Sequence, residues 1–198
     1  MLAQTYLTKW NQVPKAVRQF LLRGLIVLVV WKVLYLCFLA PARILDGPLT
    51  YSVGAMSASA LNWTTGSRDY TSVANSRDYS TLNESGTIHQ QTIMFQGQPV
   101  GNVEDACNGL ELIVLYVAFL WLLPSTLKRR IWYSVLGVIA IYIVNVARCA
   151  GISYLIIYYP QYSEFAHHYI FAFVVYAFII TLWLFYSNKV TLHAKADQ

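Results

Sequence analysis

The sequence predicts an all-α integral membrane protein with about four transmembrane helices and one extracytoplasmic insert between the first and the second helix. Composition indicates the class: of the 198 residues, 57% are hydrophobic and only 12% are charged, which is too apolar for a soluble domain. Apolar runs close to the roughly 20 residues that a helix needs to cross a bilayer alternate with polar stretches. The chain is therefore expected to cross the membrane several times.

The first span is predicted over residues 20–41. A basic segment, residues 1–19, precedes it, and Pro41 ends it. The run begins too late for a cleaved signal peptide and no small-residue cleavage site follows it, so we expect a retained helix. Residues 42–105 are rich in Ser, Thr, Asn, Gly and Asp, which indicates an insert outside the bilayer.

Residues 106–187 hold three more apolar runs and are interpreted as a three-helix membrane core, followed by a cytoplasmic tail over 188–198. The runs are 106–123, 131–147 and 169–186. The stretch 149–159 is also apolar, but about 11 residues are too few to cross about 30 Å of hydrocarbon. We therefore expect residues 149–166 to be non-helical and to form the wall of a site, because such backbone is tolerated at membrane depth only when it is buried in protein or lines a wet cavity.

One charge lies in the middle of the first predicted span. Lys32 is costly there unless it faces other helices or reaches the interface. We expect it to pair with Glu111 of the second span, which is a structural role.

Basic residues set the expected orientation, because short cytoplasmic segments carry an excess of Lys and Arg. Four spans with a cytoplasmic amino terminus place every basic cluster on one side: Lys9, Lys15, Arg18, Arg23, Lys128 to Arg130, Lys189 and Lys195. The insert, where acidic residues outnumber arginines, then faces outward. This predicts a multi-pass protein of the cytoplasmic membrane that binds lipid and no nucleic acid.

Under this topology, three kinds of side chain that can do peptide chemistry meet at the outer face. Cys107 opens the second span, Arg148 closes the third, and His167 and His168 open the fourth. Packed helices lie about 8–10 Å apart, so their ends can bring these groups within reach. A thiol made reactive by a nearby cation, a guanidinium that stabilises an oxyanion and an imidazole that exchanges protons form a cysteine acyl-transfer site.

Three segments carry a resemblance to a known family. Ala106-Cys107-Asn108-Gly109, then Asn145-Val146-Ala147-Arg148, then His167-His168-Tyr169 before a final span resembles the exosortase/archaeosortase family of membrane cysteine transpeptidases. The resemblance covers about residues 106–186. It implies that Cys107 is the nucleophile and that Arg148 and His168 complete the site, with His167 as a rival for the imidazole. Asn108, Gly109 and Asn145 are the expected supporting residues, and no cofactor or metal is expected.

The resemblance also implies the substrates. They would be exported proteins whose carboxy-terminal sorting signal combines a short motif, an apolar span and a basic end. Attack by Cys107 would give a thioester that either water or an amine, such as a lipid or glycan acceptor, resolves. The choice between hydrolysis and transfer stays open at this point.

Two alternatives from other classes also stay open. Cys107, Glu164, His167 and His168 include metal-capable ligands, although adjacent histidines are poor ligands from one helix face and no metal-binding spacing is present. The other alternative is a non-catalytic membrane assembly factor whose insert binds a partner. In that case, alanine at Cys107 or Arg148 should leave function intact.

Overall fold

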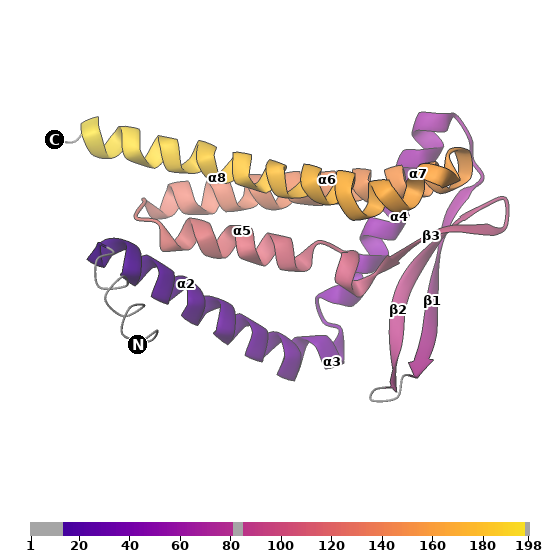
Figure 1. Cartoon of the computed structure of the whole chain (residues 1–198), viewed down its shortest axis with the longest axis horizontal. Coiled ribbons are helices and arrows are strands. Elements are labelled where there is room, and N and C mark those ends of the chain that lie inside the picture. Colours follow the sequence, from indigo (N-terminus) through magenta and orange to yellow (C-terminus); the bar gives the residue numbers. More distant parts are fainter. Residues whose placement is uncertain (1–13, 81–84, 197–198) are drawn as a thin grey trace, which may run out of the picture.

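A computed structural model describes residues 14–80 and 85–196, and it is an elongated helix bundle with a small sheet at one end (Figure 1). The elements along the chain are α2 (Lys15–Leu34), η1 (Tyr35–Leu39), α3 (Ala40–Ala42), α4 (Asp46–Thr65), β1 (Tyr70–Ser80), β2 (Ser85–Phe95), β3 (Gln98–Glu104), η2 (Asp105–Cys107), α5 (Leu110–Leu122), α6 (Leu127–Tyr158), α7 (Pro160–Phe165), η3 (Ala166–Ile170) and α8 (Phe171–Ala196).

The bundle consists of α2, α5, α6 and α8, which run lengthwise beside one another (Figure 1). Its core joins buried apolar side chains of α5, α6 and α8: Tyr116, Leu120, Ile141, Val175, Ile179 and Tyr186. Gly137 on α6 allows the ring of Tyr116 to approach closely, since a Cβ there would lie 2.0 Å from a ring carbon. The apolar runs of the sequence thus pack against each other on one side and expose large hydrophobic side chains on the other.

Three helical stretches in the described part are long and apolar enough to cross a membrane. They are Val17–Ala42, Leu127–Tyr158 and Pro160–Asn188. The expected second span corresponds to α5, which is apolar but has only 13 residues and so reaches about 20 Å. The helices are consistent with a membrane protein, with three long candidate spans and one shorter apolar helix.

The expectation that residues 149–166 are non-helical is wrong. α6 continues without a break from Leu127 to Tyr158, and its 32 residues extend about 48 Å, well beyond a hydrocarbon layer of about 30 Å. The last turns are helical because they pack on the insert, where Cys149, Ala150 and Ser153 are buried. Counting apolar residues predicts where a helix crosses the membrane. It does not predict that the same helix continues and packs against the insert.

The insert corrects the all-α prediction, because it contains a three-stranded antiparallel sheet in the order β1-β2-β3 as well as α4. Tyr70 pairs with Phe95 at one end of the β1–β2 ladder. The β2–β3 connection turns at Gln96 and Gly97, both with positive φ, as two-residue hairpins require. Together with the end of α6, the insert forms a second core, made of buried Val53, Ala58, Leu61, Tyr70, Ile93, Val100, Val103, Val146, Cys149 and Ala150.

The Lys32–Glu111 pair is confirmed. The Nζ of Lys32 on α2 forms an ion pair with Oε1 of Glu111 on the first turn of α5. The pair joins α2 to the rest of the bundle within the apolar region, where an unpaired charge would be costly.

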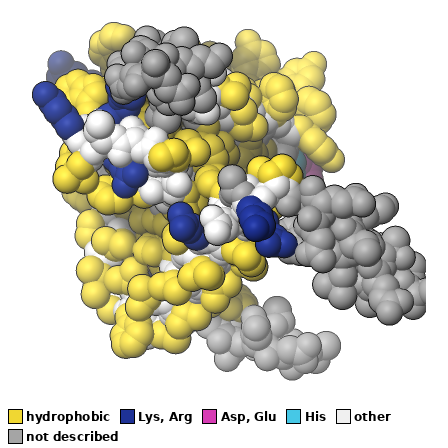
Figure 2. Space-filling view, turned by 90° about the vertical axis from the view of Figure 1, so that its left-hand side faces the viewer, with side chains coloured by type: hydrophobic (Ala, Val, Ile, Leu, Met, Phe, Trp, Pro, Cys, Tyr) yellow, Lys and Arg dark blue, Asp and Glu magenta, His cyan; other side chains and the backbone are white. Residues whose placement is uncertain are grey.

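The end of the bundle farthest from the sheet is basic. α6 begins there with Lys128, Arg129 and Arg130. Figure 2 shows this end face, with Lys and Arg side chains standing among hydrophobic ones. Basic side chains at one end of an apolar bundle fit a helix boundary at a membrane surface.

Candidate active site

The predicted site residues belong to segments that lie toward the sheet end of the bundle, including the second half of α6 and the start of the ribbon that leads into α8 (Figure 1). Cys107 is the last residue of η2, and Arg148 lies on the second half of α6. His167 and His168 lie in η3, a π-helical turn that leads into α8. Counting from Ile131, just after the basic start of α6, Arg148 is about 26 Å along the helix, close to the full thickness of the hydrocarbon layer.

Electrostatic interactions link these groups. Arg148 interacts with both the His167 imidazole and the Cys149 thiol, and Cys149 in turn interacts with Cys107. Within residues 14–80 and 85–196, no hydrogen bond or ion pair joins the side chains of Cys107, Arg148 and the two histidines. The structure thus places Arg148 near His167 and Cys149, and Cys149 near Cys107, without a direct contact among the predicted site residues in the described part of the chain.

Asn145 fixes the position of Cys107 relative to α6. Its Nδ2 donates a hydrogen bond of 3.1 Å to the backbone carbonyl of Cys107. Asn145 is one turn before Arg148 and so shares its side of α6. Gly109 suits this turn, because its φ of +90° favours glycine and a Cβ at this position would lie 3.2 Å from Nδ2 of Asn145, which is a tight contact. The buried Oδ1 of Asn145 has no hydrogen-bond partner in the described part of the chain.

A buried amide anchors the turn after Cys107 to α4. Asn108 is 2% exposed, and its Nδ2 donates to Oδ1 of Asp46 at 2.9 Å and to Oγ1 of Thr50 at 3.2 Å. Its Oδ1 accepts the backbone N–H of Leu110 at 2.8 Å, which satisfies an otherwise unpaired donor at the start of α5. The hydroxyl of Tyr35 donates to the other carboxylate oxygen of Asp46 at 3.0 Å. This network joins three helices next to the thiol.

The turn before Cys107 is anchored by an ion pair. Arg43 donates from Nε and Nη2 to the two carboxylate oxygens of Asp105, at 2.8 and 2.9 Å, and Thr50 donates from Oγ1 at 2.7 Å. Burial by itself would raise the pKa of the Asp105 carboxyl, but the hydrogen bonds from Arg43 and Thr50 and the Arg43 charge lower it below its ordinary value. Cys107 is therefore held on both sides by polar contacts to the insert.

The lowered pKa of Asp105 predicts a pH dependence of stability. The folded protein binds the Asp105 proton less tightly than the unfolded chain, so the contribution is present above the ordinary pKa and is lost as the pH falls through the folded value. We expect the melting temperature of the wild type, measured in lipid nanodiscs, to fall more between pH 5 and pH 3 than that of Asp105→Asn. Asp78→Asn on the exposed hairpin is the control, and an equal fall for the wild type and Asp105→Asn would contradict the prediction.

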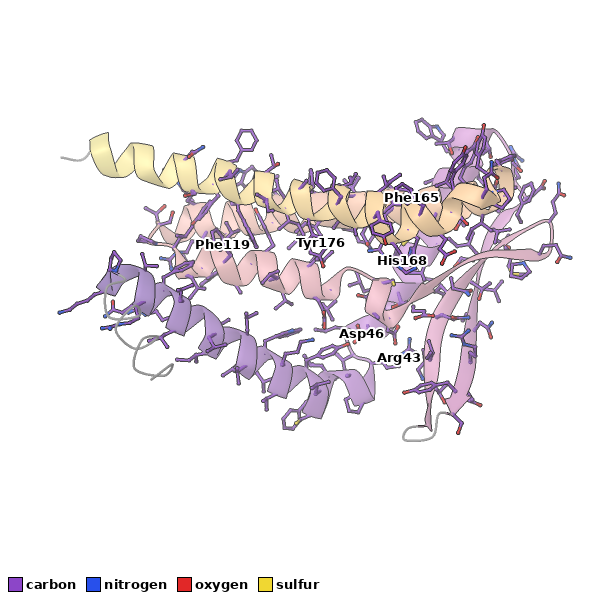
Figure 3. All side chains as sticks on the ribbon, viewed as in Figure 1. Arg43, Asp46, Phe119, Phe165, His168 and Tyr176 are labelled. Carbon is purple, nitrogen blue, oxygen red and sulfur yellow. The ribbon has the colours of Figure 1, made fainter. Side chains whose placement is uncertain are left out.

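The two histidines lie next to each other in η3. His167 interacts electrostatically with Arg148 and with Glu104 at the end of β3, and its ring lies 5.2 Å from that of His168. Both side chains are exposed in the described structure. Figure 3 labels His168 below the ribbon that leads from α7 into α8, with Arg43 and Asp46 at the base of the sheet. The assignment of the catalytic imidazole to His168, with His167 as its rival, stays a prediction.

Sequence reasoning missed Arg43, Asp46 and Thr50 as residues of this site. Arg43 and Asp46 lie just after the first span, and Glu104 and Asp105 lie three and two residues before Cys107. Opposite charges at the two ends of the insert indicated that ion pairs could form there. Only the folded structure shows which of these residues pair.

The metal alternative gains no geometric support. Among the residues that the structure describes, no group of three or more His, Cys, Asp or Glu side chains gathers in an arrangement that could hold a metal ion.

Comparison with known proteins adds one finding. A family model described as transmembrane exosortase matches residues 20–186, which is most of the chain. The match includes α5, α6, the larger parts of α2 and α8, the insert and all three predicted catalytic positions. Neither the curated proteins nor the solved structures give a significant match.

Proposed function

Because this chain belongs to the transmembrane exosortase family, we propose that it is a membrane cysteine transpeptidase or protease that cleaves the carboxy-terminal sorting signals of exported proteins. Family membership and the apolar helices make it a membrane protein. The proposal assigns the nucleophile to Cys107, oxyanion stabilisation to Arg148 and proton exchange to an imidazole of the His167–His168 pair, with His168 as the position that the sequence motif favours.

The proposed reaction has two steps. The Cys107 sulfur, as thiolate, attacks the carbonyl carbon of the scissile amide, and the negative charge on the carbonyl oxygen is stabilised by the guanidinium of Arg148. The C–N bond breaks, the imidazolium protonates the leaving amine, and a thioester remains on Cys107. Water or an amine then attacks the thioester, giving its proton to the imidazole and releasing the thiolate.

One observation supports this assignment above the others. The Asn145–Cys107 hydrogen bond ties the thiol-bearing turn to α6 one turn before Arg148. Arg148 forms no ion pair within the described residues, so its charge is not already neutralised by a carboxylate. An unpaired charge close to the hydrocarbon layer costs free energy, and residues that carry such charges usually have a function.

We further propose that the protein lies in the cytoplasmic membrane with its amino terminus inside and its site at the extracytoplasmic face. The basic end of the bundle and the sheet end that carries Cys107 lie at opposite ends (Figures 1 and 2), which fits the excess of Lys and Arg on cytoplasmic sides.

Direct detection of the thioester tests the proposal. Membranes that contain the enzyme are mixed with an exported protein of the same cell that carries a sorting tail, and the reaction is quenched in acid. We expect mass spectrometry to find the truncated substrate linked to the peptide that contains Cys107, and hydroxylamine to release it. Cleavage of the tail without any hydroxylamine-sensitive adduct on Cys107 would contradict the mechanism. Single alanine variants of His167 and His168 in the same assay identify the imidazole whose loss slows acylation.

A further inference from the structure

A groove of about 280 Å³ lies over one face of α5, between α2 and α8. Most of its lining is apolar, as with Leu28 of α2 and Leu115 of α5. The Lys32–Glu111 ion pair and Tyr176 of α8 add polar groups to the lining. The groove accommodates a few side chains of a segment that lies against it. An apolar surface with a small number of polar groups is typical of a binding site.

Aromatic rings close the groove toward the basic end of the bundle. The ring of Phe119 on α5 stacks on Trp183 of α8, with the ring centroids 4.5 Å apart. Phe20 of α2 meets the Phe119 ring edge-on, with the centroids 5.9 Å apart. Figure 3 shows Phe119, Tyr176 and His168 in this order along the bundle, toward the sheet. The groove therefore leads from the aromatic cluster toward the predicted site.

The first candidate span leaves the groove open at its side. None of the residues Val17–Ala42 is buried. The side chains of Lys32 and Glu111 are 54% and 61% exposed, although the pair lies within the apolar part of the bundle. A lipid chain offers these charges no hydrogen bond, and charges exposed to hydrocarbon are costly. A protein helix in the groove covers the pair and can contact it with a hydroxyl or amide side chain.

The thiol lies at a depth that a membrane-spanning segment reaches. Asn145, which is hydrogen-bonded to the Cys107 carbonyl, is about 21 Å along α6 from Ile131. The hydrocarbon layer is about 30 Å thick, so the Cys107 turn lies within its outer part. A peptide bond at this depth belongs to a segment that is itself in the bilayer or enters it from the outer surface.

Polar contacts connect the groove with the Cys107 turn. Glu111 interacts electrostatically with Tyr35, whose hydroxyl donates to Asp46. Asp46 also accepts a hydrogen bond from Asn108, the residue after Cys107. We propose that this groove binds the apolar membrane-spanning segment of the exported protein's sorting signal and so holds the scissile amide at Cys107. The inference rests on the proposed function and identifies the surface that receives the substrate helix.

A filled groove tests the inference by kinetics. Leu28→Trp places a large side chain in the groove, and Val29→Trp adds the same side chain at the next residue of α2, which does not line it. Both positions are exposed, so the melting temperature should stay at the wild-type value in both variants. For Leu28→Trp, we expect KM for an exported reporter with a sorting tail to rise about tenfold, with kcat within about twofold of wild type. Val29→Trp should leave KM unchanged.

Photocrosslinking identifies the occupant of the groove. Tyr176 is replaced by benzoylphenylalanine in the Cys107→Ala protein, which keeps the reporter uncleaved, and Ile143, exposed on α6, is replaced in the same way as the control. After illumination in membranes, we expect mass spectrometry to find the apolar segment of the reporter linked at position 176 and not at position 143. Links from position 176 to lipid alone, or to a second copy of the enzyme alone, would overturn the inference.

The outcomes separate this inference from the proposed function. If Cys107→Ala abolishes cleavage but Leu28→Trp keeps the wild-type KM, the groove does not receive the substrate, although the enzyme assignment stands. If Leu28→Trp and Val29→Trp raise KM equally, the effect does not come from the groove and the inference is wrong. If Cys107→Ala cleaves the reporter as well as wild type, the proposed function itself fails.

Discussion

Replacement of Cys107 by serine is expected to abolish tail cleavage, with a loss in kcat of at least about 10³-fold. The serine hydroxyl is close to the thiol in size, so it fits the same space. The hydrogen bonds that fix this turn, from Asn145 to the Cys107 carbonyl and from Asn108 to Asp46, do not involve the sulfur and are kept. What is lost is the sulfur nucleophile, because a serine hydroxyl at neutral pH attacks an amide only with a base in direct contact. The measurement is the amount of uncleaved exported protein in membranes over time, together with the melting temperature.

Cys37→Ser is the matched control for this substitution. Cys37 is also a free cysteine, but it is exposed in η1 at the end of the first candidate span. The control should cleave at the wild-type rate. If Cys107→Ser retained more than about a tenth of the wild-type rate while folded, a cysteine acyl-enzyme would not be the mechanism, and the assembly-factor alternative would gain support.

Replacement of Arg148 by alanine is expected to slow acylation by about 10²–10³-fold, the effect of removing one oxyanion-stabilising group. Arg148→Lys keeps the charge but loses the planar fork of donors, so its rate should fall between those of alanine and wild type. The loss should appear in kcat more than in KM, because the charge on the oxygen develops in the transition state. Single-turnover formation of the Cys107 thioester measures this step directly.

Arg129→Ala provides the control on the same helix, since Arg129 lies near the start of α6, at the far end of the bundle. It removes a positive charge of the same kind without touching the sheet end, and acylation should continue at the wild-type rate. Alkylation of Cys107 by iodoacetamide in the Arg148→Ala protein checks that the thiol remains accessible. Equal acylation rates in Arg148→Ala and wild type would remove Arg148 from the site.

The sequence alone determined the membrane class, the order of the apolar helices and the candidate chemistry. Long apolar runs and their basic flanks are local properties, and a span is specified by its own residues because lipid offers no competing partners for its backbone. The Lys32–Glu111 pair was also predictable, since a charge inside an apolar run needs a partner from another run. The resemblance carried by Cys107, Arg148 and the histidine pair also comes from the sequence alone, and the match over residues 20–186 confirms the family.

Only the tertiary structure decided how the insert folds and how it holds the thiol. The strands and the outer turns of α6 are stable because they bury Ile93, Val103 and Cys149 against each other and against α4. Those contacts join α4, the strands and α6, which are separate segments of the chain, so no local pattern encodes them. The pairing of Arg43 with Asp105 and of Asp46 with Asn108 depends on the same packing. The residues near Cys107 in the sequence identify it as a candidate nucleophile, but contacts between distant parts of the chain set its position.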